Sequence, residues 1–203
     1  MLGVAELEQL PVSQARAGDA GAWDALFRRF QLPLYVYVFE LVRDEQTSLD
    51  IVQETFINAA RHIHSLRSDR KFGSWLFGIA HQKCIQRWRE QARRTGVPPV
   101  SDLDEIADSE NVPAPTENAP DELLIRQEEE AEFMNLLNQL PLPQRSVLLL
   151  YFMEDFSIEE IAGITGVSVG TVKSRLHYAK KSLRKLVVDT QDPDRSPKHP
   201  KEI

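Results

Sequence analysis

The segment 169–185, VGTVKSRLHYAKKSLRK, contains six lysine or arginine residues and no acidic residue, although the whole chain has a formal net charge of −7. These side chains can pair with the O6 and N7 atoms of guanine and with the phosphate oxygens of duplex DNA. The alternative is an amphipathic helix with a solvated basic face. The predicted DNA-facing residues are Ser168, Thr171, Lys173, Ser174, Arg175, His177, Lys180 and Lys181, with Arg184 and Lys185 as further phosphate contacts.

The residues around this segment have the pattern of a helix-turn-helix. Ser157 and Glu160 have the spacing of a capping box, which satisfies backbone N–H groups at the start of a helix. Gly166 can adopt the positive φ of a tight turn, and Ser168 can cap the second helix. Apolar residues of that helix recur at three- and four-residue steps, at Val172, Leu176, Ala179, Leu183 and Leu186. With a supporting helix over about 143–153, this part is predicted to bind duplex DNA.

Two amphipathic helices are predicted in the N-terminal half. The run LDIVQETFINAARHI places one apolar stripe at Leu49, Val52, Phe56, Ala59 (or Ala60) and Ile63. The run FGSWLFGIAHQKCIQRWREQARR does the same at Phe72, Trp75, Leu76, Ile79, Ala80 and Cys84. Because no segment shows sustained alternation with period two, strands are not expected. The predicted fold class is all-α, with two small domains in which the helices pack around a core of their own.

The negative charge is concentrated in residues 98–132, which hold one basic and twelve acidic side chains. Five of the twelve prolines and no aromatic residue lie within 95–122. Such a composition cannot bury enough apolar surface to offset the entropy of ordering, so we expect a flexible linker. The predicted division is an N-terminal domain at 1–96, an acidic linker at 97–120, a C-terminal domain at 121–188 and a disordered tail at 189–203.

Other chemistry finds little support in the residue pattern. His62, His64, His81 and Cys84 raise a metal site as an alternative, but zinc needs about four ligands in supporting geometry, and a core position for Cys84 is preferred. No nucleophile–base pair or glycine-rich phosphate loop occurs, so neither an enzyme nor a cofactor is expected. The single cysteine and the absence of a signal-peptide pattern at the N-terminus predict a reduced, cytoplasmic compartment without membrane insertion.

The run LDIVQETFINAARHIHSLRSDRKFGSWLFGIAHQKCIQRWREQARR resembles the second region of bacterial sigma factors of the extracytoplasmic-function group. The C-terminal segment, including VGTVKSRL, is similar to the fourth region of the same family. Both blocks occur in the family's order and have a linker between them. The resemblance implies an alternative sigma factor that binds core RNA polymerase and directs promoter recognition, promoter melting and transcription initiation.

The resemblance also implies roles for particular residues. The helix with DIVQETF would dock on the β′ clamp helices, and the C-terminal domain on the β flap. The loop 64–71 would form a pocket for a flipped base of the −10 element, and the helix at 169–185 would read the −35 element. Gly78 and Gln82 stand where the family often has Arg and Asn. The implied core-polymerase residues are Asp50, Gln53, Glu54 and Asn58, and the implied −10 residues are Arg70, Lys71, Phe72, Ser74, Gln82, Lys83, Arg87 and Trp88.

Within this interpretation, Trp75 is expected in the core and Trp88 on the surface. An anti-sigma factor is implied as a partner that covers the binding surfaces and holds the protein at the inner membrane. The acidic linker would line the polymerase cleft, or it would serve as a soluble spacer. Two other classes remain: a free-standing regulator with an N-terminal sensing or oligomerisation domain, and a metal-dependent enzyme with a DNA-binding appendage.

Overall fold

The computed structural model describes residues 10–95, 136–153 and 155–191, and every regular element in these ranges is a helix. Residues 10–95 contain four α-helices and two short 3₁₀ helices, η1 and η2, between the third and the fourth. The all-α fold class is confirmed. The bounds are α1 Val12–Arg16, α2 Ala20–Val42, α3 Glu45–His62, η1 Ile63–Ser65, η2 Asp69–Lys71, α4 Phe72–Thr95, α7 Leu142–Met153, α8 Ile158–Thr165 and α9 Val169–Gln191.

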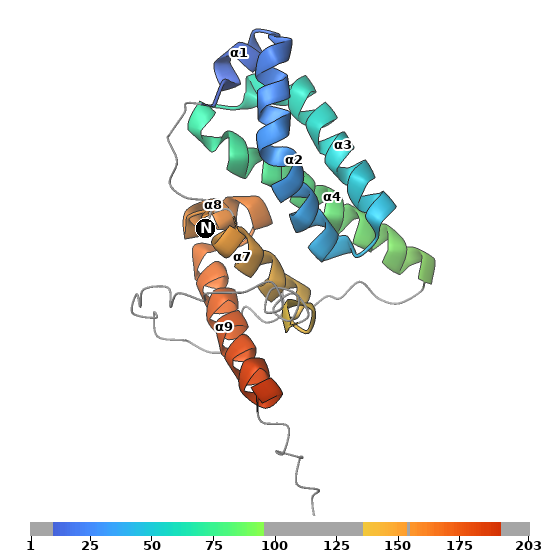
Figure 1. The fold of residues 1–203 in the computed structure, drawn as a ribbon, viewed down its shortest axis with the longest axis vertical. Coiled ribbons are helices and arrows are strands. Elements are labelled where there is room, and N and C mark those ends of the chain that lie inside the picture. The colour runs from blue at the N-terminus through green and yellow to red at the C-terminus, as the bar shows by residue number, and fades with distance from the viewer. Residues whose placement is uncertain (1–9, 96–135, 154, 192–203) are drawn as a thin grey trace, which may run out of the picture.

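Polar caps set the beginnings of the two helices α2 and α3. Asp19 accepts a hydrogen bond from the backbone N–H of Ala22, and Asp44 accepts one from Thr47. Each cap satisfies a backbone donor that has no partner within its helix. Helix α2 ends at Arg43, whose backbone is left-handed with φ 59°, and the chain turns there into α3. The two helices therefore form a hairpin, against which α4 packs (Figure 1).

The buried stripe of α3 differs from the prediction at one position. Leu49, predicted to be buried, is 47% exposed. The buried side instead includes Ser48 and Thr55 beside the apolar Ile51, Val52 and Ala59. These two hydroxyls can be buried because each donates to the carbonyl of the preceding helical turn, Ser48 to Asp44 at 2.6 Å and Thr55 to Ile51 at 2.7 Å. The prediction for Leu49 was wrong because it counted only apolar residues.

The C-terminal half contains the predicted helix-turn-helix. Ser157 and Glu160 form the capping box at the start of α8, and Gly166 ends that helix with φ 72°. The hydroxyl of Ser168 accepts a hydrogen bond from the backbone N–H of Thr171 at 3.0 Å, which caps α9. Val172, Leu176 and Ala179 on the inner side of α9 are buried. These local predictions are confirmed.

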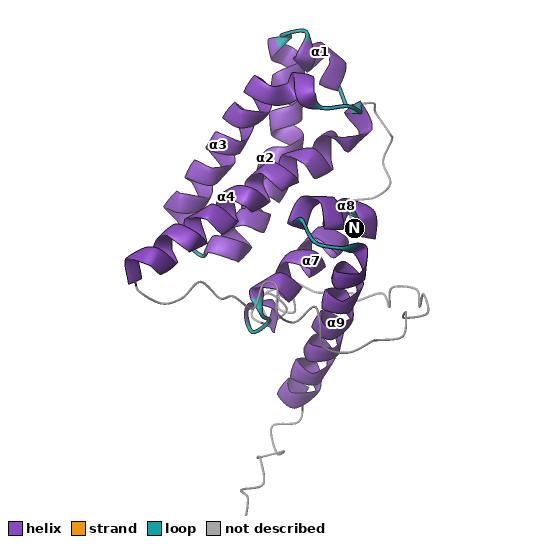
Figure 2. Ribbon diagram, turned by 180° about the vertical axis from the view of Figure 1, so that it is seen from behind, coloured by secondary structure: helices purple, strands orange, loops and turns teal. Residues whose placement is uncertain are grey.

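The two halves lie against each other. Helix α8 packs along α4, and α7 packs on α2 (Figures 1 and 2). Buried residues of both halves, such as Phe77 and Ile164, belong to one continuous hydrophobic cluster. The structure thus differs from the prediction of a separate core in each half, since apolar side chains of α4 are covered by the helix-turn-helix as well as by α2 and α3.

Some predictions lie outside the described residues. These include the acidic linker at 97–120, the first residues of the predicted C-terminal domain and most of the predicted tail. Helix α9 continues to Gln191, so residues 189–191 do not belong to a disordered tail. Among the described helices, none combines the length and the apolar character needed to cross a bilayer.

Candidate nucleic-acid and polymerase interface

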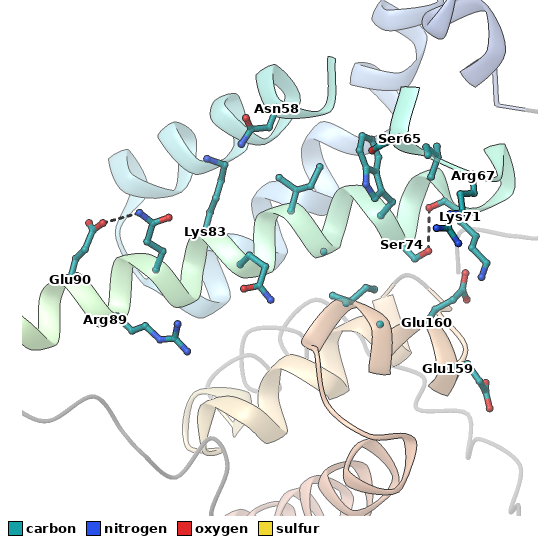
Figure 3. A pocket seen from close by; sticks show the side chains of 18 of the residues that line it. Asn58, Ser65, Arg67, Lys71, Ser74, Lys83, Arg89, Glu90, Glu159 and Glu160 are labelled. Atoms are coloured by element: carbon teal, nitrogen blue, oxygen red, sulfur yellow. Dashed lines mark hydrogen bonds between the residues drawn. The ribbon is translucent and has the colours of Figure 1, made fainter. Parts of the chain in front are cut away.

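A cavity of about 1120 Å³ lies between α4, the segment 65–71 and α8 (Figure 3). The segment 65–71 forms one wall with Ser65, Arg67 and Lys71, which belong to the predicted base pocket. That loop therefore lies next to the face of α4. The opposite wall comes from α8. Four of the predicted −10 residues and one of the predicted polymerase residues line the cavity: Lys71, Ser74, Gln82, Lys83 and Asn58.

The remaining predicted −10 residues lie elsewhere. Arg70 and Arg87 are exposed, but they are not part of the cavity wall. Phe72 is fully buried, with its ring centroid 5.6 Å from that of Phe30. Its assignment to the DNA surface was wrong, since it is the first core residue of α4. Trp88, predicted to be on the surface, is half-buried and packed against the hydrophobic core, and Trp75 is half-buried beside the cavity.

An ion pair joins the predicted polymerase helix to the predicted DNA helix. Glu54 on α3 accepts a hydrogen bond from Lys83 on α4 at 2.6 Å, and Arg87 lies 3.8 Å from the same carboxylate. The hydrogen bond from Lys83 is the main reason that the pKa of Glu54 lies below its ordinary value. The sequence analysis assigned Glu54 to the polymerase surface and Lys83 and Arg87 to the −10 DNA surface. In the structure the three side chains lie together.

The other predicted polymerase residues follow one side of α3. Gln53 is exposed, and Asp50 is half-buried and accepts a hydrogen bond from Gln46 at 3.2 Å. The positions 50, 54 and 58 are four residues apart, so their side chains share a helix face. Glu54 and Asn58 lie on the side of this face that is next to α4. Gln53 lies at its solvent-exposed edge.

The predicted duplex-reading residues lie along α9. Lys173, His177 and Lys181 are exposed, as is Ser168 at the N-cap. The hydroxyls of Ser168 and Thr171 lie 2.8 Å apart, and Ser174 donates to the carbonyl of Gly170. The ammonium group of Lys180 lies 5.3 Å from the ring centroid of Tyr151 and 5.5 Å from that of Phe152. This cation–π contact fixes Lys180 at the junction with α7.

A buried polar group that sequence reasoning missed lies at the junction of the halves. The Tyr37 hydroxyl lies 2.8 Å from Nδ1 of His81 and 3.0 Å from Oγ of Ser146, joining α2, α4 and α7. Burial, with a smaller contribution from the charge of Arg175, lowers the pKa of His81 to about 4. Burial raises the pKa of Tyr37 and takes that of Cys84 to about 12. His81 is therefore a neutral structural residue, and Cys84 occupies the core position predicted for it.

Metal binding finds no support in the described ranges, where no three His, Cys, Asp or Glu side chains are placed to hold an ion. What the described chain does present is two basic helices, one beside a cavity and one in a helix-turn-helix. These features are typical of a protein that handles nucleic acid at two places.

Comparison with known proteins identifies the family. Residues 26–94 match the sigma-70 region 2 model, and residues 130–183 match the sigma-70 region 4 model. The RNA polymerase sigma-H factor of Pseudomonas aeruginosa is 32% identical over 186 residues, covering 90% of this chain and 94% of the relative. The ECF RNA polymerase sigma-E factor of Escherichia coli is 32% identical over 180 residues, covering 87% and 92%. The chain belongs to the extracytoplasmic-function group of the sigma-70 family of RNA polymerase sigma factors.

Two solved structures share the fold. CnrH, solved in complex with the cytosolic domain of CnrY, has a TM-score of 0.62 at 24% identity, covering 93% of this chain and 99% of that one. RpoE of Bartonella quintana, solved with the anti-sigma factor NepR, has a TM-score of 0.57 at 24% identity, covering 80% and 96%. As an alternative sigma factor, the chain binds core RNA polymerase and directs promoter recognition and transcription initiation, and its family is not an enzyme family.

Proposed function

We propose that the chain directs core RNA polymerase to promoters with two elements, and that separate surfaces of the chain read them. The exposed front of α9, with Lys173 and His177, enters the major groove of the −35 duplex. The face of α4 and the segment 64–71 hold the melted −10 strand. The observation that carries the proposal is the cavity where the loop predicted to take a flipped base, which includes Lys71, meets Gln82 and Lys83 of the predicted strand surface.

The polymerase contacts are assigned to the polar side of α3. Gln53 is exposed there, and Glu54 keeps about half of its side-chain surface exposed while paired with Lys83. Carboxylates and amides on this side suit charge-assisted hydrogen bonds to basic helices such as those of the β′ clamp. The C-terminal domain is assigned to the β flap.

An anti-sigma factor is the proposed regulator. Support comes from the solved relative whose structure contains the anti-sigma factor NepR, and from the membership of the chain in the same group. Such a partner would cover the surfaces assigned to polymerase and DNA, and a membrane-bound one would hold this chain at the inner membrane of the bacterium.

The direct test is binding to purified core RNA polymerase. The unmodified chain should elute with core as a one-to-one complex. The double variant Asp50→Ala, Gln53→Ala should bind core about tenfold or more weakly, the loss expected when about 1.4 kcal/mol of polar contact is removed. The control is Glu45→Ala, an exposed residue in the first turn of the same helix, which should bind core within about twofold of the unmodified chain.

A chain that binds a defined duplex but never associates with core would instead be a free-standing regulator. A complex with core that is unaffected by the α3 double variant would move the polymerase contact to another surface.

A further inference from the structure

We propose that Arg16 on α1 is a positioning residue for the base pocket of the segment 64–71. In this proposal, Arg16 fixes the segment against α1 and turns the carboxylate of Asp69 away from the DNA strand. This inference rests on the role proposed above for the segment. The match to the sigma-70 region 2 model begins at residue 26, so Arg16 lies outside the matched range. Its role is therefore inferred from its contacts.

The base-pocket segment is fixed near its two ends by burial. Leu66 is 8% exposed and Phe72 is fully buried, and both side chains belong to the hydrophobic core. Between them, residues 67–71 are half-buried or exposed, and the backbone N–H of Lys71 donates to the carbonyl of Ser68 at 3.0 Å. A short turn outside the core has a low density of contacts to hold it in one conformation. Its shape therefore depends on contacts from elsewhere in the chain.

Arg16 supplies such a contact. Its Nη2 atom donates a hydrogen bond to Oδ1 of Asp69 at 2.6 Å and a second one to the carbonyl of Leu66 at 3.3 Å. One guanidinium nitrogen thus joins the start of the turn to its middle. The Nε atom of Arg16 is buried and has no hydrogen-bond partner among the described residues, so this part of the side chain is withdrawn from water. The two bonds of Nη2 offset that loss.

Helix α1 is held firmly against α2. Val12 and Ala15 are buried in the core, and the indole N–H of Trp23 on α2 donates to the carbonyl of Ala15 at 3.0 Å. The left-handed backbone of Gly18, with φ 91°, then turns the chain from α1 into α2. Because Arg16 directly follows Ala15, its backbone is fixed relative to α2, and its side chain can hold the segment in place.

Asp69 is the one acidic residue of the segment 64–71, which also carries three lysine or arginine residues. Arg67 and Lys71 line the cavity beside α4, whereas Asp69 is not part of the cavity wall (Figure 3). An unpaired carboxylate in this segment can pair with one of these cations or repel a phosphate of the strand. The ion pair with Arg16 therefore leaves the cations of the pocket available to DNA.

The first readout is backbone amide hydrogen exchange of the free full chain. With Arg16→Ala, exchange over 64–71 should become about tenfold faster or more, while α2 and α4 stay within about twofold of the unmodified chain. The control is Arg28→Ala, which removes an exposed ion pair with Asp24 at 2.9 Å on α2 and should leave the exchange over 64–71 unchanged. Unchanged exchange over 64–71 in Arg16→Ala would overturn the proposal.

The second readout is the base preference at the downstream promoter motif. Core polymerase loaded with each variant transcribes a library made from one promoter, found by mapping start sites. The downstream motif is randomised, and a transcribed barcode identifies each member. Because one cavity takes one flipped base, Arg16→Ala should lower the preference at one position about fivefold or more and leave the others within about twofold. Reduced transcription from all members with an unchanged preference would mean a merely structural role and would overturn the proposal.

The double variant Arg16→Ala, Asp69→Ala tests the effect of the carboxylate. It removes the freed charge but does not restore the bonds to the segment. Total transcription from the library should be about fivefold lower in Arg16→Ala and return to within about twofold of the unmodified chain in the double variant. The base preference should remain reduced in both. Equal totals in the single and the double variant would overturn the role given to Asp69.

The two proposals fail separately. If no form of the chain starts transcription with core, but Arg16→Ala speeds exchange over 64–71, the anchoring by Arg16 stands and the proposed function fails. If promoter-specific transcription continues and the base preference of Arg16→Ala is unchanged, the proposed function stands and the positioning role fails.

Discussion

The helices α4 and α9 are both assigned to DNA, yet they are built into the molecule differently. Helix α4 packs against α2, α3 and α8, and Phe77, His81 and Cys84 on its inner sides are buried. Helix α9 buries a narrower stripe through Val172 and leaves the front of its basic face exposed. A substitution on α4 should therefore change stability and strand binding together, whereas one on the front of α9 should change recognition alone.

The largest effect is expected at the centre of α4. Phe77→Ala should lower the free energy of unfolding by about 3–5 kcal/mol, because the ring is fully buried and contacts both Tyr37 and Phe156. Val172→Ala on α9 removes less buried surface and should cost less. Urea unfolding followed by circular dichroism measures both changes. Equal losses in the two variants would contradict the difference drawn between the helices.

The next largest effect is a pH dependence of the stability, caused by His81 on α4. The pKa of His81 is about 4 in the folded chain and about 6.5 when unfolded, so the unfolded state binds the proton more readily. The associated stability is fully present above about pH 6.5 and is lost as the pH falls towards 4, to a total of about 3 kcal/mol.

The measurement compares the unmodified chain with His81→Asn, whose amide oxygen can occupy the place of Nδ1. The free energy of unfolding is determined for both between pH 7 and pH 4, and the difference between them isolates His81 from the carboxylates that titrate in the same range. We expect the gap in stability between the two proteins to narrow as the pH falls. A constant gap would mean that His81 is not held neutral.

On α9, Lys173→Ala should leave the stability within about 0.5 kcal/mol, since the side chain is exposed. The preference for a selected −35 duplex over a random duplex should fall by about 1–3 kcal/mol if the side chain contacts a base edge. Fluorescence anisotropy with both duplexes gives the ratio. Lys181→Ala, further along the helix, should weaken both duplexes alike, and a uniform loss for Lys173→Ala would make it a phosphate contact too.

The smallest effect is expected at Glu54, where the proposed polymerase surface of α3 meets the proposed DNA surface of α4. Glu54→Gln removes the charge that holds Lys83 and Arg87. Stability should change by no more than about 0.2–1 kcal/mol, because the carboxylate is half exposed and screened by solvent. Single-strand binding should become stronger as the two cations are released, and Glu45→Gln on the same helix should leave it unchanged. Weaker strand binding by Glu54→Gln would contradict the view that Glu54 and the DNA strand compete for Lys83 and Arg87.

Local features of the fold could be predicted from the sequence. The capping box at Ser157 and Glu160 and the left-handed Gly166 each depend on a few neighbouring residues, and the structure has all of them as expected. The stripe of α9 through Val172 and Leu176 depends on helical period alone. The segment 65–71 and Gln82 could be placed at one site because the family resemblance supplied the long-range information.

Contacts between distant parts of the chain could not be predicted. Tyr37 and Ser146 are separated by 109 positions, and nothing in the pattern of either indicates the buried hydrogen bond between them. Phe72 was misassigned because its neighbours on both sides suit a DNA surface, while helical period buries it. The packing of α8 on α4 could not be predicted either, since Gly78, which lies opposite Ile164, is only one of several small residues in α4.

The most direct measurement of the central claim is transcription of fragmented genomic DNA of the source bacterium by core polymerase loaded with this chain, with the transcript 5′ ends sequenced. We predict start sites that are absent with core alone and that share two upstream motifs at a fixed spacing, near −35 and −10. Lys173→Ala should weaken dependence on the upstream motif, and Gln82→Ala dependence on the downstream one. Start sites identical to those of core alone would contradict the account.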